Sequence, residues 1–216
     1  MREIKCVQKS SAWFEARRGV PTASVFSEIM TPKTRKMSAS AIKLCYELVA
    51  QIHYPGPLEE LDRYQSAAMR HGNEYEAEAR AAYNLIRDDQ TALDVGFIMD
   101  DLGRFGCSPD ALCFGETEGG LELKCPSGAK HVEYLHDGIL PTEYMAQVHG
   151  ALLITGRLWW DFMSYSRGLP PLIVRVTPSD FTRSLRDCLD LFWVEFEGIR
   201  KSIARLKSPD ESPFSE

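Results

Sequence analysis

The sequence lacks several features that would restrict its class. It has no apolar run near the roughly 20 residues that cross a membrane, so no membrane association is expected. Its first residues, MREIKCVQKSSAWF, lack the apolar core of a signal peptide, which predicts a cytoplasmic protein. None of the six cysteines forms a C-x-x-C pair, and no histidine lies at zinc-finger spacing from them. We therefore expect reduced core cysteines and no structural zinc or iron–sulfur site.

Composition and charge indicate a globular protein with an uneven charge distribution. The 216 residues are 44% hydrophobic and 26% charged, without an internal repeat or a low-complexity tract. Residues 1–53 carry nine Lys and Arg against four Asp and Glu, whereas residues 54–122 carry five against fifteen. An acidic centre beside a basic flank suits a site for divalent cations next to a phosphate-binding surface. Two ordinary solvated surfaces explain the same numbers, so charge alone leaves both interpretations open.

Hydrophobic periodicity predicts one α/β domain over residues 1–206, of the α+β type with a mixed sheet and helices packed on it, followed by a polar tail at 207–216. Helical spacing predicts four helices, over 39–53, 63–86, 142–156 and 179–206. Short apolar stretches between turn residues predict five strands, over 92–99, 104–114, 120–126, 157–166 and 171–176. Ser38 and Thr142 are expected N-caps and Gly156 a C-cap, with Ile42 and Leu85 facing the core.

Two adjacent strands carry charges inside apolar runs, in CSPDALCF and LELKC. Side chains alternate across a strand, so Glu122 and Lys124 share one face. The apolar residues between them share the other face. The turn GETEGG joins the two strands as a hairpin, which lets Asp110 approach Glu122 on the same face.

Two neighbouring carboxylates repel each other unless a cation neutralises them. Mg²⁺ prefers oxygen ligands, which Asp110, Glu122 and the Leu123 carbonyl can supply. Lys124 would then orient or help deprotonate the attacking water and offset charge in the transition state of phosphodiester hydrolysis. The alternative is a surface hairpin in which Glu122 and Lys124 only pair with each other. That alternative does not explain the apolar neighbours, because exposed pairs contribute little stability.

Five blocks in order resemble the phage lambda exonuclease family of the PD-(D/E)xK nuclease superfamily. The blocks are AWFEARRGVPTAS, GNEYEAEAR, CSPDAL, LELKCP and YMAQVHGAL, within residues 12–165. The resemblance implies a restriction-endonuclease-like core, in which a central mixed sheet is flanked by helices.

The resemblance also implies roles for individual residues. The catalytic set is Asp110, Glu122, Lys124, Glu76 and Gln147. The metal is Mg²⁺, with Mn²⁺ as a substitute, held by Asp110, Glu122 and the Leu123 carbonyl, and by Glu76 through water. A pocket for a DNA 5′-phosphate is formed by Arg17, Ser24 and Ser108. The basic loop TPKTRKMS (31–38) is expected to contact DNA through Lys33, Arg35 and Lys36, although a flexible basic loop without that role is an open alternative.

The implied function is a Mg²⁺-dependent 5′→3′ exonuclease that digests one strand of linear double-stranded DNA and leaves 3′ overhangs. Family membership further implies a homotrimeric ring, a single-strand annealing recombinase as partner, and a role in phage or prophage recombination inside a bacterial host. Two alternatives stay open. One is a structure-specific or restriction-type endonuclease with the same metal site, and the other is a non-catalytic DNA-end-binding module.

Overall fold

A five-stranded mixed sheet forms the centre of the protein. The computed structural model describes residues 1–61 and 67–207, without the side chains of residues 67–74. The strand order is β10-β9-β8-β7-β4, and within it only the pair β8–β9 is parallel. The strands are β4 (Thr91–Leu93), β7 (Ala111–Phe114), β8 (Gly119–Lys124), β9 (Trp159–Ser164) and β10 (Leu172–Val176). This arrangement confirms the predicted mixed sheet.

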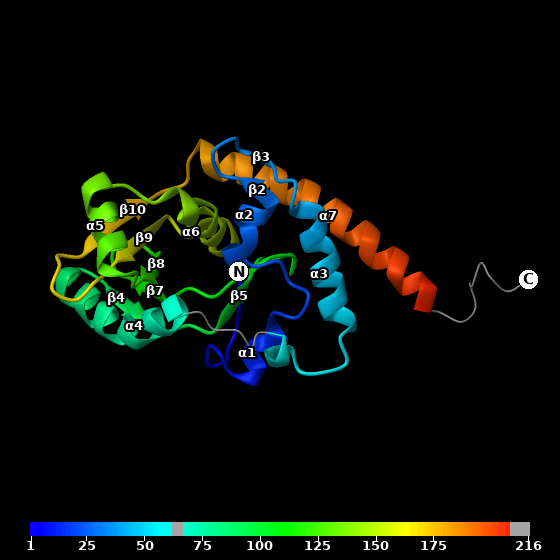
Figure 1. Ribbon diagram of the computed structural model, residues 1–216, viewed down its shortest axis with the longest axis horizontal. Helices are drawn as coiled ribbons and strands as arrows, with labels where there is room; N and C mark the ends of the chain where they lie inside the picture. Colours follow the sequence, from blue (N-terminus) through cyan, green and yellow to red (C-terminus); the bar gives the residue numbers. More distant parts are fainter. Residues whose placement is uncertain (62–66, 208–216) are drawn as a thin grey trace, which may run out of the picture.

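Helices cover both faces of this sheet (Figure 1). On one face, Leu121 and Leu123 of β8 pack with Ala79 and Tyr83 of α4 (Ala67–Ile86). On the other face, Trp160 and Phe162 of β9 belong to a larger core that includes α6 (Thr142–Thr155). The alternation of side chains along each strand therefore divides the apolar residues between two cores.

Smaller elements complete the fold. A three-stranded sheet has the order β1-β5-β6, and a two-stranded hairpin joins β2 to β3. These strands are β1 (Arg2–Ile4), β2 (Met30–Thr31), β3 (Lys36–Met37), β5 (Phe97–Met99) and β6 (Gly106–Cys107). The remaining helices are α1 (Ser11–Ala16), α2 (Phe26–Ile29), α3 (Ala41–His53), α5 (Gly128–Asp137) and α7 (Asp180–Lys207), with 3₁₀ turns η1 (Ala23–Val25) and η2 (Leu58–Glu60). Helix α7 packs on α3 and α6, and its C-terminal half extends away from the sheet (Figure 1).

Two predicted strands are each divided between the sheets. The stretch 92–99 forms β4 and β5, and the stretch 104–114 forms β6 and β7. Pro109 interrupts the second stretch because proline has no N–H to donate to a ladder. Between β4 and β5, the carbonyls of Val95 and Gly96 accept hydrogen bonds from the Gln8 side chain instead of from a strand. Local periodicity did not reveal these breaks.

The predicted helix boundaries need small corrections. Helix α6 begins at Thr142 with Pro141 as its N-cap, so Thr142 is not the cap, whereas Gly156 is a left-handed C-cap with φ of 66°, as predicted. Helix α3 has Ser40 as its N-cap, so the predicted cap Ser38 is wrong; the Ser38 hydroxyl is hydrogen-bonded to that of Ser40. Helix α5 was not predicted, although Ser127 caps its start and Gly138 its end. Residues 62–66 and 208–216, which include most of the predicted tail, lie outside the described residues.

Ile42 and Leu85 were expected to face the core, but both side chains are exposed. All six cysteines are free and five of them are buried, in agreement with the prediction for small core residues. In the described part of the chain, no helix is both long and apolar enough to span a membrane.

The close approach of α6 to α2 generates a stability prediction. A Cβ at Gly150 would lie 2.4 Å from Phe26 Cδ2, and Phe26 is fully buried. Gly150→Ala is therefore expected to destabilise the protein by about 1–3 kcal/mol through overpacking. The control is Gly198→Ala on α7, where a Cβ meets open space. That change is expected to stabilise by about 0.5–1 kcal/mol because alanine favours helix. Urea unfolding measures both, and equal effects would contradict the packing.

Candidate active site

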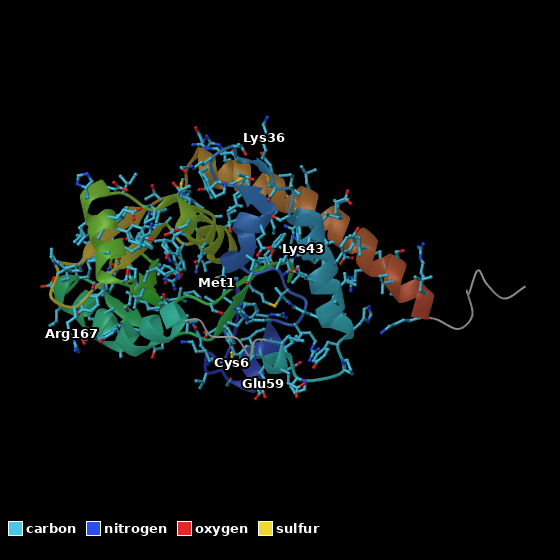
Figure 2. The ribbon with its side chains drawn as sticks, in the orientation of Figure 1. Met1, Cys6, Lys36, Lys43, Glu59 and Arg167 are labelled. Carbon is cyan, nitrogen blue, oxygen red and sulfur yellow. The ribbon has the colours of Figure 1, made fainter. Side chains whose placement is uncertain are left out.

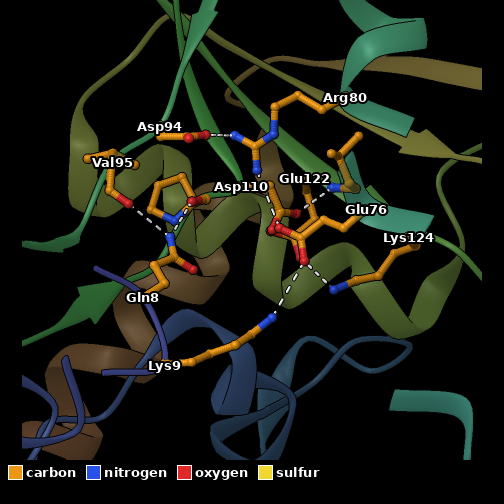
Figure 3. A network of polar contacts seen from close by, with 11 residues as sticks. Gln8, Lys9, Glu76, Arg80, Asp94, Val95, Asp110, Glu122 and Lys124 are labelled. Atoms are coloured by element: carbon orange, nitrogen blue, oxygen red, sulfur yellow. Dashed lines mark hydrogen bonds and ion pairs between the residues drawn. The ribbon is translucent and has the colours of Figure 1, made fainter. Parts of the chain in front are cut away.

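The β7–β8 hairpin brings Asp110 and Glu122 together. Ala111 pairs with Leu121, and the Asp110 N–H donates to the Leu121 carbonyl at 3.2 Å. Asp110 directly precedes Ala111 and Glu122 directly follows Leu121, so the two acidic residues adjoin the end of this ladder. Figure 3 shows both carboxylates in one network of polar contacts, which also includes Glu76 and Lys124.

The backbone of Leu123 faces the same edge. Its N–H donates to Asp110 Oδ2 at 2.5 Å. The N–H and C=O of a strand residue point in the same direction, so the Leu123 carbonyl also points toward the Asp110 side of β8. On the other side of β8, the Lys124 carbonyl accepts from the Tyr165 N–H beyond β9. Two carboxylates and one carbonyl therefore converge on one edge.

The Glu122 carboxylate is buried and receives two donors on a single oxygen. Lys124 Nζ and Gln147 Nε2 both lie 2.5 Å from Glu122 Oε1. Gln147 projects from α6. Lys124 Nζ lies 5.2 Å from the ring centroid of Tyr144, which belongs to the same helix. Burial lowers the pKa of Lys124, but the charges of Glu122 and Asp110 outweigh it and hold that pKa above its usual value. Lys124 is therefore a cation at neutral pH.

The pKa of Asp110 is raised to about 8. Burial is the main cause, and the neighbouring charge of Glu122 adds to it. The Lys124 ammonium and the Leu123 N–H oppose this shift without cancelling it. Ionisation of both carboxylates at once is unfavourable because the two negative charges repel each other. A divalent cation bound between them would stabilise the doubly ionised state.

The donor set fits a hard divalent cation. Carboxylate and carbonyl oxygens are the ligands that Mg²⁺ prefers, and Mg²⁺ usually retains several waters instead of a complete protein shell. Within the described residues, no group of three His, Cys, Asp or Glu side chains is arranged to hold a metal, so a third protein ligand would have to come from the backbone. The site therefore suits a partly hydrated ion held by two carboxylates and a backbone oxygen.

Glu76 of α4 approaches this cluster, unlike its described acidic neighbour. It pairs with Arg80 at 3.3 Å and with Lys9 at 3.5 Å, and its charge contributes to the raised pKa of Asp110. Glu78 instead pairs with Arg167 at 2.5 Å. The side chain of Glu74 lies outside the described part of the chain. Of these two glutamates, Glu76 therefore lies near the carboxylate cluster, whereas Glu78 is paired with Arg167.

Arg17, Ser24 and Ser108 are linked in one hydrogen-bonded chain. Arg17 Nη1 donates to Ser108 Oγ at 3.2 Å, and Nη2 lies 3.5 Å from Thr22 Oγ1. The Thr22 hydroxyl is 3.0 Å from that of Ser24. Ser108 lies two residues before Asp110, so these donors stand beside the carboxylates.

Two further residues of this pocket were not predicted. Trp13 Nε1 donates to Ser108 Oγ at 2.8 Å, and the Arg17 guanidinium lies 4.1 Å from the Trp13 ring centroid. Thr22 joins Arg17 to Ser24. The available signal was helical spacing, because Trp13 precedes Arg17 by one turn. Arg18, the competing candidate, donates instead to the carbonyls of Gln51, Tyr54 and Gly56 and pairs with Glu15.

The basic loop is a hairpin that the structure does not bring to the carboxylates. Strands β2 and β3 pack on α7, and Arg35 lies 5.9 Å from the Phe181 ring centroid. Lys36 projects outward at the edge of the molecule (Figure 2). Within the described contacts, neither these two side chains nor Lys33 touches Asp110, Glu122 or Glu76. A DNA-contacting role for this hairpin remains a prediction.

Comparisons with known proteins agree with this geometry. A model of the YqaJ-like viral recombinase domain matches residues 12–158. An alkaline exonuclease, LHK-Exo, from Laribacter hongkongensis has a crystal structure with a TM-score of 0.75 and 31% identity, covering 91% of this chain and 97% of that chain. Its complex with dAMP gives the same values. A phage related exonuclease from Haemophilus somnus 129PT, at 10% identity and a TM-score of 0.61, covers 85% of this chain and 96% of its own and shares the fold. No curated protein matches.

The matched region contains the whole hairpin, α6 up to its C-cap and the Arg17 pocket. The structural neighbours are exonucleases with the PD-(D/E)xK fold, as the resemblance predicted. This chain belongs to the YqaJ-like viral recombinase family of lambda-exonuclease-like nucleases.

Proposed function

We propose that the protein is a Mg²⁺-dependent 5′→3′ exonuclease that digests one strand of linear double-stranded DNA and leaves 3′ overhangs. The supporting observation is that the Arg17–Ser108 contact lies two residues from the paired carboxylates of Asp110 and Glu122. A phosphate-binding group and a candidate metal site are thus joined by a short rigid segment.

Their separation favours attack near a DNA end. The Cα atoms of Ser108 and Asp110 are at most about 7 Å apart along the chain. Arginine offers paired donors to phosphate oxygens, and the serine hydroxyls add neutral ones. A terminal 5′-phosphate held there would place a bond close to the end of its strand at the carboxylates. An endonuclease has no need of such an end-binding pocket.

Each residue has a distinct role in this proposal. Asp110, Glu122 and the Leu123 carbonyl would hold Mg²⁺ or Mn²⁺, with Glu76 acting through water. The ion would supply a Lewis acid and a more acidic water. Lys124, as an ammonium, stabilises negative charge developing on the phosphate, which assigns it an electrostatic role instead of that of a base. Gln147 holds Glu122 in orientation through its amide and adds no charge.

The wider context of the proposal follows the family resemblance. We propose a homotrimeric ring around duplex DNA and a single-strand annealing protein as partner, in phage-type recombination in the cytoplasm of a bacterial host. Exposed apolar side chains on edge strand β4 and on α7 offer surface for subunit contacts, among them Leu93, Leu191 and Val194.

End-labelled linear duplex and closed circular DNA test the activity. With Mg²⁺, we expect release of mononucleotides from 5′ ends only, and an intact circle. Lys124→Ala is expected to lower the rate about 10²–10³-fold, because it removes a preorganised charge at the transition state. Lys201→Ala, an exposed change on α7, is the control. Cleavage of the circle would favour an endonuclease, and DNA binding without turnover would favour an end-binding module.

Metal binding is expected to appear in stability as well as in activity. Saturating Mg²⁺ should raise the melting temperature. When the Mg²⁺ concentration is a hundred times the dissociation constant, the free energy of unfolding should rise by about 2.7 kcal/mol. Asp110→Asn should abolish this response. Without metal above pH 8, where Asp110 is ionised in the folded protein, the same variant should be more stable than the wild type, because it removes a buried charge that Glu122 repels. An unaltered Mg²⁺ response in Asp110→Asn would exclude the proposed metal site.

The end-binding pocket predicts a preference for phosphorylated ends. Wild-type protein should digest a 5′-phosphorylated duplex faster than a 5′-hydroxyl duplex. Arg17→Ala should remove the preference by slowing only the phosphorylated substrate, because it deletes the charged donors. Arg18 is not a suitable control, since it binds the carbonyls of Gln51 in α3 and of Gly56 and so holds the end of α1 in place. Arg200→Ala on α7 serves instead. A preference retained in Arg17→Ala would remove Arg17 from the pocket.

A further inference from the structure

A tight turn before α1 has an unusual backbone. The Ser10 N–H donates to the Val7 carbonyl at 3.2 Å, which closes a four-residue turn with Lys9 in its third position. Lys9 has φ of 66°, a conformation that favours glycine. Among the described residues other than glycine, only Arg35 shares a positive φ. A lysine at such a position requires an explanation from its surroundings.

The turn is anchored on both sides. Gln8 Nε2 donates to the Pro109 carbonyl at 2.7 Å and to the Val95 carbonyl at 3.0 Å. Pro109 is the residue immediately before Asp110. On the other side, Ser10 is the N-cap of α1, where its hydroxyl accepts from the Trp13 N–H. The turn therefore connects the carboxylate cluster directly to the helix that ends at Arg17.

This anchoring directs the Lys9 side chain toward the acidic cluster. Lys9 Nζ lies 3.5 Å from Glu76 Oε2, and its side chain is 53% exposed (Figure 3). A pocket of about 430 Å³ opens beside it, with walls that include Lys9, Glu76, Arg80 and Asp110. A ligand entering this pocket would meet the lysine and the carboxylates together.

The Glu76 carboxylate has a second cation beside Lys9. Arg80 already pairs with Glu76 at 3.3 Å, so the carboxylate has a nearer cation. A half-exposed pair at 3.5 Å contributes little to stability. The Lys9 ammonium is half-exposed in the wall of an open pocket that also contains Asp110 of the proposed Mg²⁺ site, and the ligand class that suits an ammonium in that position is a phosphate.

We infer that Lys9 is a substrate-binding residue that contacts a phosphate of the DNA strand being cut, from the N-terminal side of the carboxylate cluster. This inference rests on the proposed nuclease function and extends it. Lys124 lies on β8 and Lys9 on the turn, so the strand would be held between two cations from separate elements. The Arg17 pocket would bind the terminal phosphate, and Lys9 an internal one.

The salt dependence of DNA binding tests this contact. Binding of a 5′-phosphorylated duplex is measured with Ca²⁺ in place of Mg²⁺, from about 50 to about 200 mM salt. Loss of one phosphate contact reduces the slope of log K against log salt by about 0.9. Lys9→Ala should show this reduction in slope. The ratio of wild-type to variant affinity should therefore be about threefold larger at about 50 mM salt than at about 200 mM salt. Lys9→Arg should retain the wild-type slope.

Two controls separate binding from folding. Lys9→Gly should lose the contact and yet melt at the same or a higher temperature than the wild type, because glycine adopts φ of 66° without strain. Lys201→Ala, which also removes an exposed lysine from a loose pair with a glutamate, should leave the slope unchanged.

The outcomes are distinct. An unchanged slope in Lys9→Ala overturns the inference even if the rate of digestion falls, since that result assigns Lys9 to positioning Glu76. A lower melting temperature for Lys9→Gly also overturns it, because the turn would then need the lysine for folding. If the wild type neither binds nor digests DNA, the proposed function fails and the inference fails with it. If the wild type digests DNA and only the slope is unaffected, the inference alone fails.

Discussion

The structure depends on the register between β7 and β8, which brings Asp110 and Glu122 together at the end of the ladder. The same register packs Leu121 and Leu123 beneath α4. A slip of one residue would turn these leucines toward α6 and bury Glu122 and Lys124 against Tyr83. Burial of the apolar face therefore supplies the free energy that holds two like charges together on the other face. The core and the candidate metal site are two consequences of one pairing.

Tight packing around the hairpin turn reinforces this register. A Cβ at Gly119 or Gly120 would lie 2.2 Å or 2.3 Å from the ring of Trp159 or Trp160, so β8 can lie against β9 only because both residues are glycine. The buried Arg157 donates to the carbonyls of Cys113 and Gly119, one on each strand of the hairpin. The strands are thus tied at the turn end by a guanidinium and at the open end by the Leu123–Asp110 hydrogen bond.

Sequence reasoning succeeded where a local rule determines the geometry. Period-two alternation placed Glu122 and Lys124 opposite Leu121 and Leu123, and a Gly-rich turn predicted the hairpin. It failed at the break between β6 and β7, although Pro109 is a local signal for that break. It also could not reveal the hydrogen bond from the Gln8 side chain to the Pro109 carbonyl, because the two residues lie 101 positions apart and no pattern along the chain encodes the contact. Helix α5 was missed although both of its caps are visible in the sequence.

The residues proposed for substrate recognition and those proposed for metal binding come from different parts of the chain that meet at one short segment. The N-terminal segment brings Lys9, Trp13 and Arg17, and the hairpin brings the carboxylates. They join at residues 108–110, because Ser108 accepts from Trp13 and Arg17 while the Pro109 carbonyl accepts from Gln8. In the proposed function, a phosphate that engages Arg17 would also act on the Ser108 hydroxyl, two residues from Asp110. This tripeptide would then set the spacing between the end of a DNA strand and the candidate metal site, and the rigidity of its contacts would determine how precisely an end is measured before the strand is cut.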